Sequence, residues 1–175
     1  MSAPADGEFL LVAQELLDCA ALALDTTAAG RPPRICLYPG AEPTWDACDC
    51  GMLALHVPRN YPSDRFPDQK VAPPFKPGAG CSIPFTVVEY VVTVLRCVPG
   101  NDNDRPPSCD RLNASMATQL DDRQAVLWGV QCCLESRTHM ISDQLAVGEQ
   151  GGCAGSELHV FVAFSNCKPC PDGFF

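Results

Sequence analysis

The segment Phe85–Val98 constrains the fold of this chain more than any other part of its sequence. Aliphatic and aromatic residues occupy both its odd and its even positions, and many of them are β-branched valines. Side chains alternate between the two faces of a strand, so a strand of this composition is covered on both sides. The sequence therefore predicts a central strand over Phe85–Val98, in a sheet that is buried around it.

Two helices are predicted by apolar residues at three- and four-residue steps. The first spans Glu8 to about Leu24, and its wide apolar stripe suits burial against a sheet or a neighbouring subunit. The second begins after Ser108, a good N-cap residue, and runs to about Arg137. Its predicted apolar seam consists of Leu112, Met116, Leu120, Leu127, Val130 and Leu134.

Shorter strands are predicted over Arg34–Tyr38 and Cys50–Val57, and a hairpin over Gln144–Val147 and Glu157–Phe164 around the Gly-rich loop 148–155. Residues 58–84 contain seven prolines, which indicates a long loop or extended arm. The order of elements predicts an α+β fold. We expect a mostly antiparallel sheet of about four to five strands, with the N-terminal helix and one long helix packed on it. A single domain is expected over residues 1–165, followed by a loose cysteine-containing tail at 166–175.

Composition argues against several classes of function. The net charge of −9 opposes sequence-specific nucleic-acid binding and docking on an anionic membrane, both of which rest on Lys and Arg. No apolar run approaches the roughly 18 residues of a membrane-spanning helix. The first eight residues are acidic and lack the basic region of a signal peptide, so we expect synthesis in the cytoplasm.

Twelve cysteines are many for a chain of 175 residues that can bury a core of its own. Disulfides are therefore expected, at least two in the mature form, although sequence alone does not fix their pairing. Cys97 and Cys109 bracket one loop, and a bond between them would stabilise the fold by roughly 2–3 kcal/mol. Cys153, in the Gly-rich hairpin loop, is a candidate partner of Cys48 or Cys50.

Cys132 and Cys133 adjoin in the second predicted helix, where their side chains point about 100° apart. A bond between the two would strain the helix. One of them is expected either to face Cys19 across a helix pair or to fill the core. A zinc site is disfavoured, because only the pairs Cys48/Cys50 and Cys167/Cys170 have short spacings and no histidine lies near either pair.

The sequence predicts no catalytic, cofactor-binding or metal site, and the protein is expected not to be an enzyme. A cysteine nucleophile needs a positioned base. His56 and His159 fall on predicted strands, where outward-facing or edge positions are expected for them. Asp102, Asp104 and Asp110 lack the glycine and terminal glutamate of a calcium-binding EF-hand loop.

Three stretches carry a resemblance to a known group of proteins: Trp45–Ala54 (WDACDCGMLA), Arg105–Cys109 (RPPSC) and Gly151–Leu158 (GGCAGSEL). Together they resemble small neck and tail-completion proteins of long-tailed bacteriophages that infect actinobacteria. The element order from Glu8 to Phe164 is also similar to the tail-terminator family of siphophages.

This resemblance implies a virion structural protein that works as a homohexameric ring on the tail tube. Such a ring ends polymerisation of the tube, contacts the tube protein and the head connector, and lets DNA pass without specific binding. An acidic lumen involving loops 101–105 or 148–155 is expected. One ring patch is expected from the 58–84 arm and the first helix, and the other from the exposed sheet face.

Alternative functions stay open at the level of sequence. A second interpretation is another phage component: a head–tail stopper, an adaptor or a minor tail protein. A stopper should be mostly β and an adaptor mostly helical. A cytoplasmic enzyme or redox protein with a reactive cysteine is a third interpretation, and a low thiol pKa would mark it. A secreted disulfide-rich binding module is the fourth.

Overall fold

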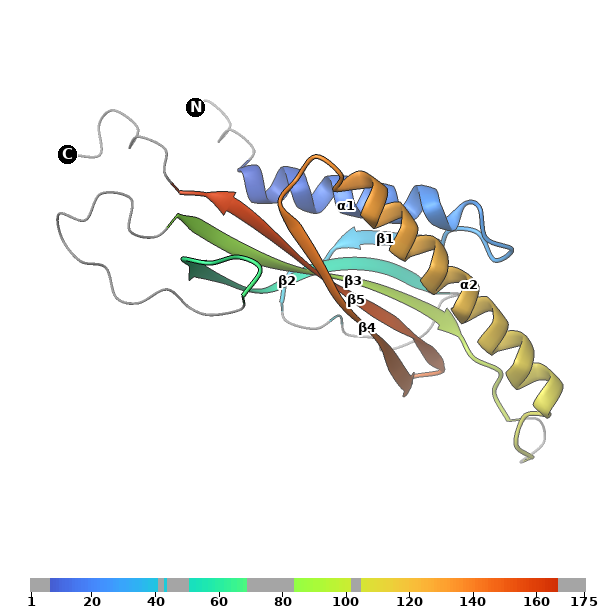
Figure 1. Cartoon of the computed structure of the whole chain (residues 1–175). Coiled ribbons are helices and arrows are strands. Elements are labelled where there is room, and N and C mark those ends of the chain that lie inside the picture. The colour runs from blue at the N-terminus through green and yellow to red at the C-terminus, as the bar shows by residue number, and fades with distance from the viewer. Residues whose placement is uncertain (1–6, 41–42, 44–50, 69–83, 102–104, 167–175) are drawn as a thin grey trace, which may run out of the picture.

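The computed structural model describes residues 7–40, 43, 51–68, 84–101 and 105–166, and the remaining residues are left out of the description. Seven elements form two layers, with both helices on the same face of a five-stranded sheet (Figure 1). In chain order they are α1 Glu8–Leu24, β1 Arg34–Leu37, β2 Met52–Ser63, β3 Phe85–Cys97, α2 Cys109–Cys133, β4 His139–Gln150 and β5 Cys153–Ser165. The predicted α+β fold, with an N-terminal helix and one long helix, is confirmed.

The sheet has the order β1-β2-β3-β5-β4, so β3 is its central strand, as its composition predicts. Only β1 and β2 pair in parallel, and the other three pairs are antiparallel. β1 and β4 are the two edges among the described strands. α1 contacts β1, β2 and β3, whereas α2 contacts β5.

The main core lies between the helices and the sheet, where the buried face of α1 packs on alternating residues of β2, β3 and β5. Tyr90 is fully buried there, and its hydroxyl donates a hydrogen bond of 3.0 Å to the Phe9 carbonyl. The wide stripe of α1 is thus mostly used inside the domain, because Val12, Leu16 and Leu17 are all buried. The second face of the sheet carries two smaller apolar clusters, around Leu95 and around Phe161.

β2 corrects the prediction of a loop or arm beginning at Pro58, because the strand continues to Ser63. Strand β1 pairs only with Met52–Leu55, so beyond Leu55 β2 is itself an edge among the described strands. Proline lacks an N–H donor and is tolerated at a sheet edge. A register shift between His56 and Arg59 accommodates Pro58. Residues 69–83 of the predicted arm lie outside the described part.

The C-terminal hairpin is longer and tighter than predicted. β4 begins at His139 and β5 at Cys153, so the Gly-rich segment 148–155 is mostly strand rather than a loose loop. Gly151 and Gly152 form the two-residue turn, with φ of 56° and 78°, a conformation that favours glycine. Helix α2 ends at Cys133 rather than near Arg137, since the chain must turn there to place β4 beside β5.

Ser108 is the N-cap of α2, as predicted, and its hydroxyl accepts a hydrogen bond from the Arg111 backbone N–H at 3.4 Å. Replacing Ser108 with alanine is expected to lower the free energy of unfolding by about 1 kcal/mol, because a backbone donor of the first turn loses its partner. Urea denaturation checks this value, with Ser115→Ala on the same helix as the control. An equal loss in both variants would contradict the capping role.

Candidate assembly surfaces

The first half of α2 carries apolar side chains that the domain does not cover. From Cys109 to Asp121, all of which the structure describes, no residue is buried. Leu112, Met116 and Leu120 are each about half exposed, at 48%, 49% and 51%. This corrects the predicted seam, whose first three members are exposed. The start of α2 projects past the end of β3 (Figure 1). Such exposed apolar surface is typical of a protein–protein contact.

The β4 edge is the first of two candidate assembly surfaces. Leu145 on β4 is 49% exposed, and Trp128 on α2 is 64% exposed. At about 100° per residue, Leu120 falls on the side of α2 opposite Gly129, whereas Trp128 falls nearly opposite the buried Val126 and Val130. Gly129 lies against Ala23 of α1. Leu120 therefore points away from α1, on the side of α2 that contacts β4 through Gln144, while Trp128 points away from the sheet.

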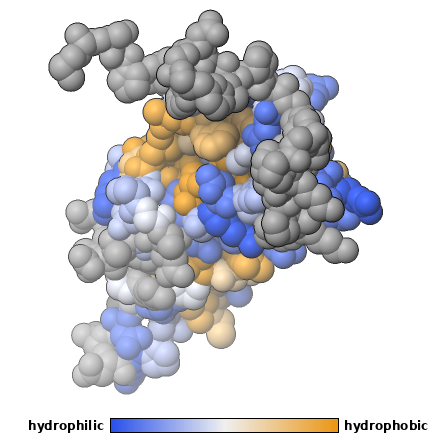
Figure 2. Space-filling model, turned by 90° about the vertical axis from the view of Figure 1, so that its left-hand side faces the viewer, coloured by the Kyte–Doolittle hydropathy of each residue, from blue (hydrophilic) through white to orange (hydrophobic). Residues whose placement is uncertain are grey.

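The β1 edge is the second candidate assembly surface. A shallow groove of about 270 Å³ lies where β1 ends against the start of α1, lined by Leu10, Leu37 and Val57 among others. Leu10 is 48% exposed and Val57 42%. Figure 2 looks at the side of the molecule where α1 begins and shows hydrophobic surface gathered on this face. Both edges of the sheet therefore present apolar side chains, but different ones.

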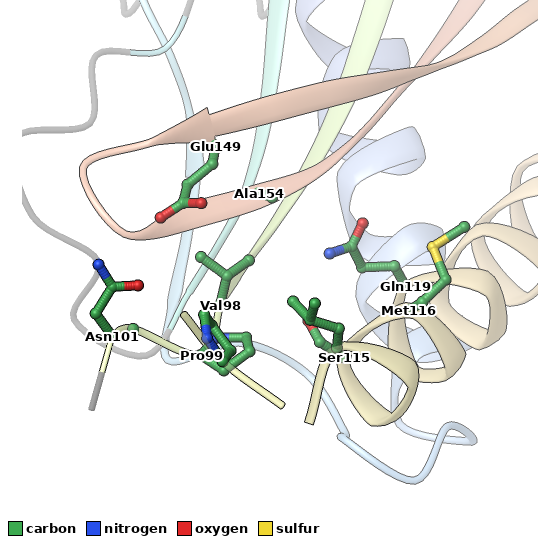
Figure 3. Close-up of a pocket in the computed structure, with 11 residues that line it drawn as sticks. Val98, Pro99, Asn101, Ser115, Met116, Gln119, Glu149 and Ala154 are labelled. Carbon is green, nitrogen blue, oxygen red and sulfur yellow. The ribbon is translucent and has the colours of Figure 1, made fainter. Parts of the chain in front are cut away.

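A cavity of about 430 Å³ lies between the start of α2, the end of β3 and the tip of the β4–β5 hairpin (Figure 3). Val98, Leu112 and Met116 supply apolar lining, while Glu149 is its one charged residue among those described. The lining contains no histidine or cysteine among the described residues, so the cavity offers neither the base nor the thiol of a cysteine nucleophile. It belongs instead to the uncovered surface of α2.

A charged cluster lies on the second face of the sheet, around Glu89 of the central strand. The Glu89 carboxylate accepts a hydrogen bond from His159 Nδ1 at 2.8 Å and another from Arg59 Nε. Burial acts to raise the pKa of Glu89, but the hydrogen bonds from His159 and Arg59 outweigh it, so the pKa lies below its ordinary value. These contacts satisfy the carboxylate with internal partners and make the cluster a structural ion-pair network.

Neither of the two histidines expected at outward-facing or edge positions is exposed, although His56 lies where β2 becomes an edge among the described strands. His56 is only 3% exposed, and His159 is half-buried beside Glu89. Both flank Val91 in the same row of the sheet, because His56 and His159 are its register partners on β2 and β5. Side chains on the second face of the sheet are mostly buried, which the sequence does not reveal, and this explains why the two histidines are not exposed. This face is therefore not the open ring patch that the sequence predicts.

The helix pair is joined by a disulfide between Cys19 of α1 and Cys133 of α2, whose Cα atoms are 6.4 Å apart. The bond uses Cys133, whereas Cys132 is an exposed free thiol. Adjacent residues of a helix point in different directions, and only Cys133 is turned toward α1.

The outcome differs for the other predicted disulfide pairings, those of Cys97 with Cys109 and of Cys153 with Cys48 or Cys50. Cys97 and Cys109 are both exposed and do not bond to each other, which corrects that pairing. On β5 and β3, Cys153 and Cys97 are directly opposite in register. Cys153 is disulfide-bonded, and both cysteines predicted as its partner, Cys48 and Cys50, lie outside the described residues.

The described part of the chain contains no group of three or more His, Cys, Asp or Glu side chains that is suited to a metal ion. The spacings considered for zinc, Cys48/Cys50 and Cys167/Cys170, lie outside that part, as do Asp102 and Asp104. No helix among the described residues is both long enough and apolar enough to cross a membrane.

No protein-family model matches the sequence, and no curated protein matches it. The candidate surfaces therefore rest on the geometry of the chain itself.

Proposed function

We propose that this chain is a virion structural protein, a tail terminator that assembles as a head-to-tail ring of six copies at the top of a phage tail tube. The ring ends polymerisation of the tube and joins the tail to the head connector. The protein is made in the host cytoplasm and acts in the neck of the assembled particle.

One observation carries this proposal: among the described residues, neither of the two opposite edges of the sheet has a further partner strand, and both edges carry apolar side chains, but different ones. A ring is built from heterologous contacts, in which one patch of a subunit binds a different patch of the next. Leu145 lies on the β4 edge, and Leu10 and Val57 lie at the β1 edge. Patches of different composition on opposite edges suit that arrangement and do not suit a two-fold dimer.

The mixed composition of the fold supports a terminator over other neck components. A stopper should be mostly β and an adaptor mostly helical, whereas this domain combines two helices with a five-stranded sheet. With a net charge of −9, a ring of this chain would offer few cations to DNA phosphates in its lumen. DNA would then pass through without being held.

Assembly of the purified protein tests the proposal, alone and with the tail-tube protein of the same phage. Mass photometry is expected to show a species of about 113 kDa, six times the 18.8 kDa of one chain. Negative-stain images should show a six-fold annulus, and the tubes should be shorter when the protein is present. A monomer that leaves tube length unchanged, even with tube protein in excess, would contradict the proposal.

A further inference from the structure

The two open edges of the sheet match each other in length. β1 consists of the four residues Arg34–Leu37. β4 is longer, but its register with β5 shifts between Ile141 and Gln144 and again between Val147 and Gln150. Such irregularities disturb the ladder and end regular pairing. The regular part of the β4 edge is therefore the four-residue segment Gln144–Val147, the same length as β1.

The directions of the two edges also agree. β1 runs parallel to β2, and three antiparallel steps then lead through β3 and β5 to β4. β4 therefore runs opposite to β1. If a second copy continues the sheet in the same orientation, its β1 lies antiparallel beside the β4 of the first copy. Antiparallel strands pair through their free backbone groups without any crossover connection.

We infer that β1 of one copy pairs with Gln144–Val147 of the next copy. This inference rests on the proposed ring and specifies the contact between its subunits. Full overlap of the two four-residue segments allows one antiparallel register, with Cys36 opposite Leu145 and Ile35 opposite Ala146. A slip by one residue would turn each side chain to the other face.

In this register, each row of directly paired residues also continues from one copy into the next without a shift. Within one copy, the row that contains Cys36 passes through Ala54, Thr93 and Glu157 to Leu145. The paired register continues this row from Leu145 of one copy to Cys36 of the next. The row that contains Ile35 likewise ends at Ala146 in the same copy.

The side chains at this contact fit it. Leu145 is 49% exposed and Ile35 is 37% exposed, and both would lose apolar surface to water. The sheet would continue across the contact with matching length, direction and register, so the occupant of each edge is a second copy of this chain.

A single cysteine substitution tests the register. Leu145→Cys places a thiol opposite the free, half-buried Cys36 of the next copy. Opposite residues in an antiparallel pair have Cα atoms about 4.5–5.5 Å apart, within the range of a disulfide. In one copy the two positions lie four strands apart, roughly 19 Å, too far for an internal bond. Under mild oxidation with tube protein present, non-reducing electrophoresis should show a ladder that extends beyond the dimer, up to six copies.

Two matched controls make the result specific. Leu145→Cys combined with Cys36→Ser should lose the ladder, because the partner thiol is gone. Ala146→Cys lies one residue away but on the other face, and it should give no ladder with Cys36. A second variant, Ile35→Cys with Ala146→Cys, repeats the test on that face and should restore the ladder.

The outcomes separate this inference from the proposed function. Rings in the wild type without a ladder in either cysteine variant would overturn the β1–β4 contact and leave the terminator proposal standing. A ladder that survives Cys36→Ser, or that stops at the dimer, would overturn the contact as well. A wild type that forms no ring with tube protein present, and variants without a ladder, would overturn both.

Discussion

Replacing Asp122 with alanine is expected to lower the free energy of unfolding by about 3–5 kcal/mol, because it leaves a buried guanidinium without its partner. The Asp122 side chain is 2% exposed and that of Arg96 11%. Asp122 accepts hydrogen bonds from Arg96 Nε at 2.7 Å and Nη2 at 3.0 Å, and from the Thr27 hydroxyl at 3.2 Å. Arg96 also donates to the Gly30 carbonyl. The network thus joins α2, the end of β3 and the loop after α1.

The neighbouring residue Asp121 supplies a matched control. It is exposed, and its carboxylate accepts a hydrogen bond from the Ala28 backbone N–H at 3.2 Å. Asp121→Ala is expected to cost less than about 1 kcal/mol, since its partner can turn to water. For a domain of this size, the Asp122→Ala loss corresponds to a fall in Tm of about 10 °C. Urea denaturation and calorimetry at pH 7 measure both quantities.

A double substitution isolates the reason for the loss. Asp122→Leu with Arg96→Met removes both charges and keeps similar volumes, and it should recover most of the stability lost in Asp122→Ala. If Asp122→Ala and Asp121→Ala cost the same, the ion pair does not hold α2 to the sheet. If the double variant is as unstable as Asp122→Ala, the loss comes from packing rather than from an unpaired charge.

The elements that sequence predicted well are those whose pattern is set by local periodicity. The central strand was expected over Phe85–Val98 and is found at Phe85–Cys97, because a strand covered on both faces has a composition unlike any other segment. The N-cap role of Ser108 could likewise be predicted, because its hydroxyl accepts a hydrogen bond from a backbone N–H only three residues away. β2 was underestimated, because prolines at 58 and 62 normally end a strand and topology makes that stretch an edge.

The candidate surfaces could not be predicted, because they depend on which parts of an apolar pattern the fold leaves uncovered. Leu112 and Met116 continue the same helical seam as Val130, yet only Val130 is buried. Periodicity records that a stripe is apolar, but not whether the domain or a second copy covers it. That β4 rather than β5 is the edge follows from β5 pairing with the central strand, a long-range choice. The buried ion pair was missed for the same reason, because nothing in the sequence marks Asp122, rather than Asp110 or Asp121, as the buried carboxylate of α2.

Removing the disulfide between α1 and α2 is expected to destabilise the protein by about 4 kcal/mol. Cys19 and Cys133 are separated by 114 residues, and in the chain-entropy model a loop of that length loses much freedom when it is closed. The helices also pack closely beside the bond, because a Cβ on Gly129 would lie 2.6 Å from the Cβ of Ala23. Without the bond, the unfolded chain gains entropy while the native contacts remain.

The variant Cys19→Ala with Cys133→Ala isolates this bond. Reductant alone does not, because Cys153 is also disulfide-bonded and would be reduced at the same time. Cys132→Ala is the matched control, since Cys132 adjoins Cys133 but is an exposed free thiol, and its substitution should change stability by less than about 0.5 kcal/mol. Urea denaturation of oxidised protein should place the double variant at a clearly lower midpoint than the control.

The same urea denaturation, applied to reduced protein, tests whether stability depends on oxidation of the bond. Protein kept reduced after purification should unfold at or below the midpoint of the oxidised double variant, and air oxidation should restore the wild-type midpoint over minutes to hours. Such behaviour would mean that a protein made in a reducing cytoplasm gains stability only after release to an oxidising environment. Equal midpoints for oxidised wild type and the double variant would show that the helices are held together by packing alone, with no contribution from the bond.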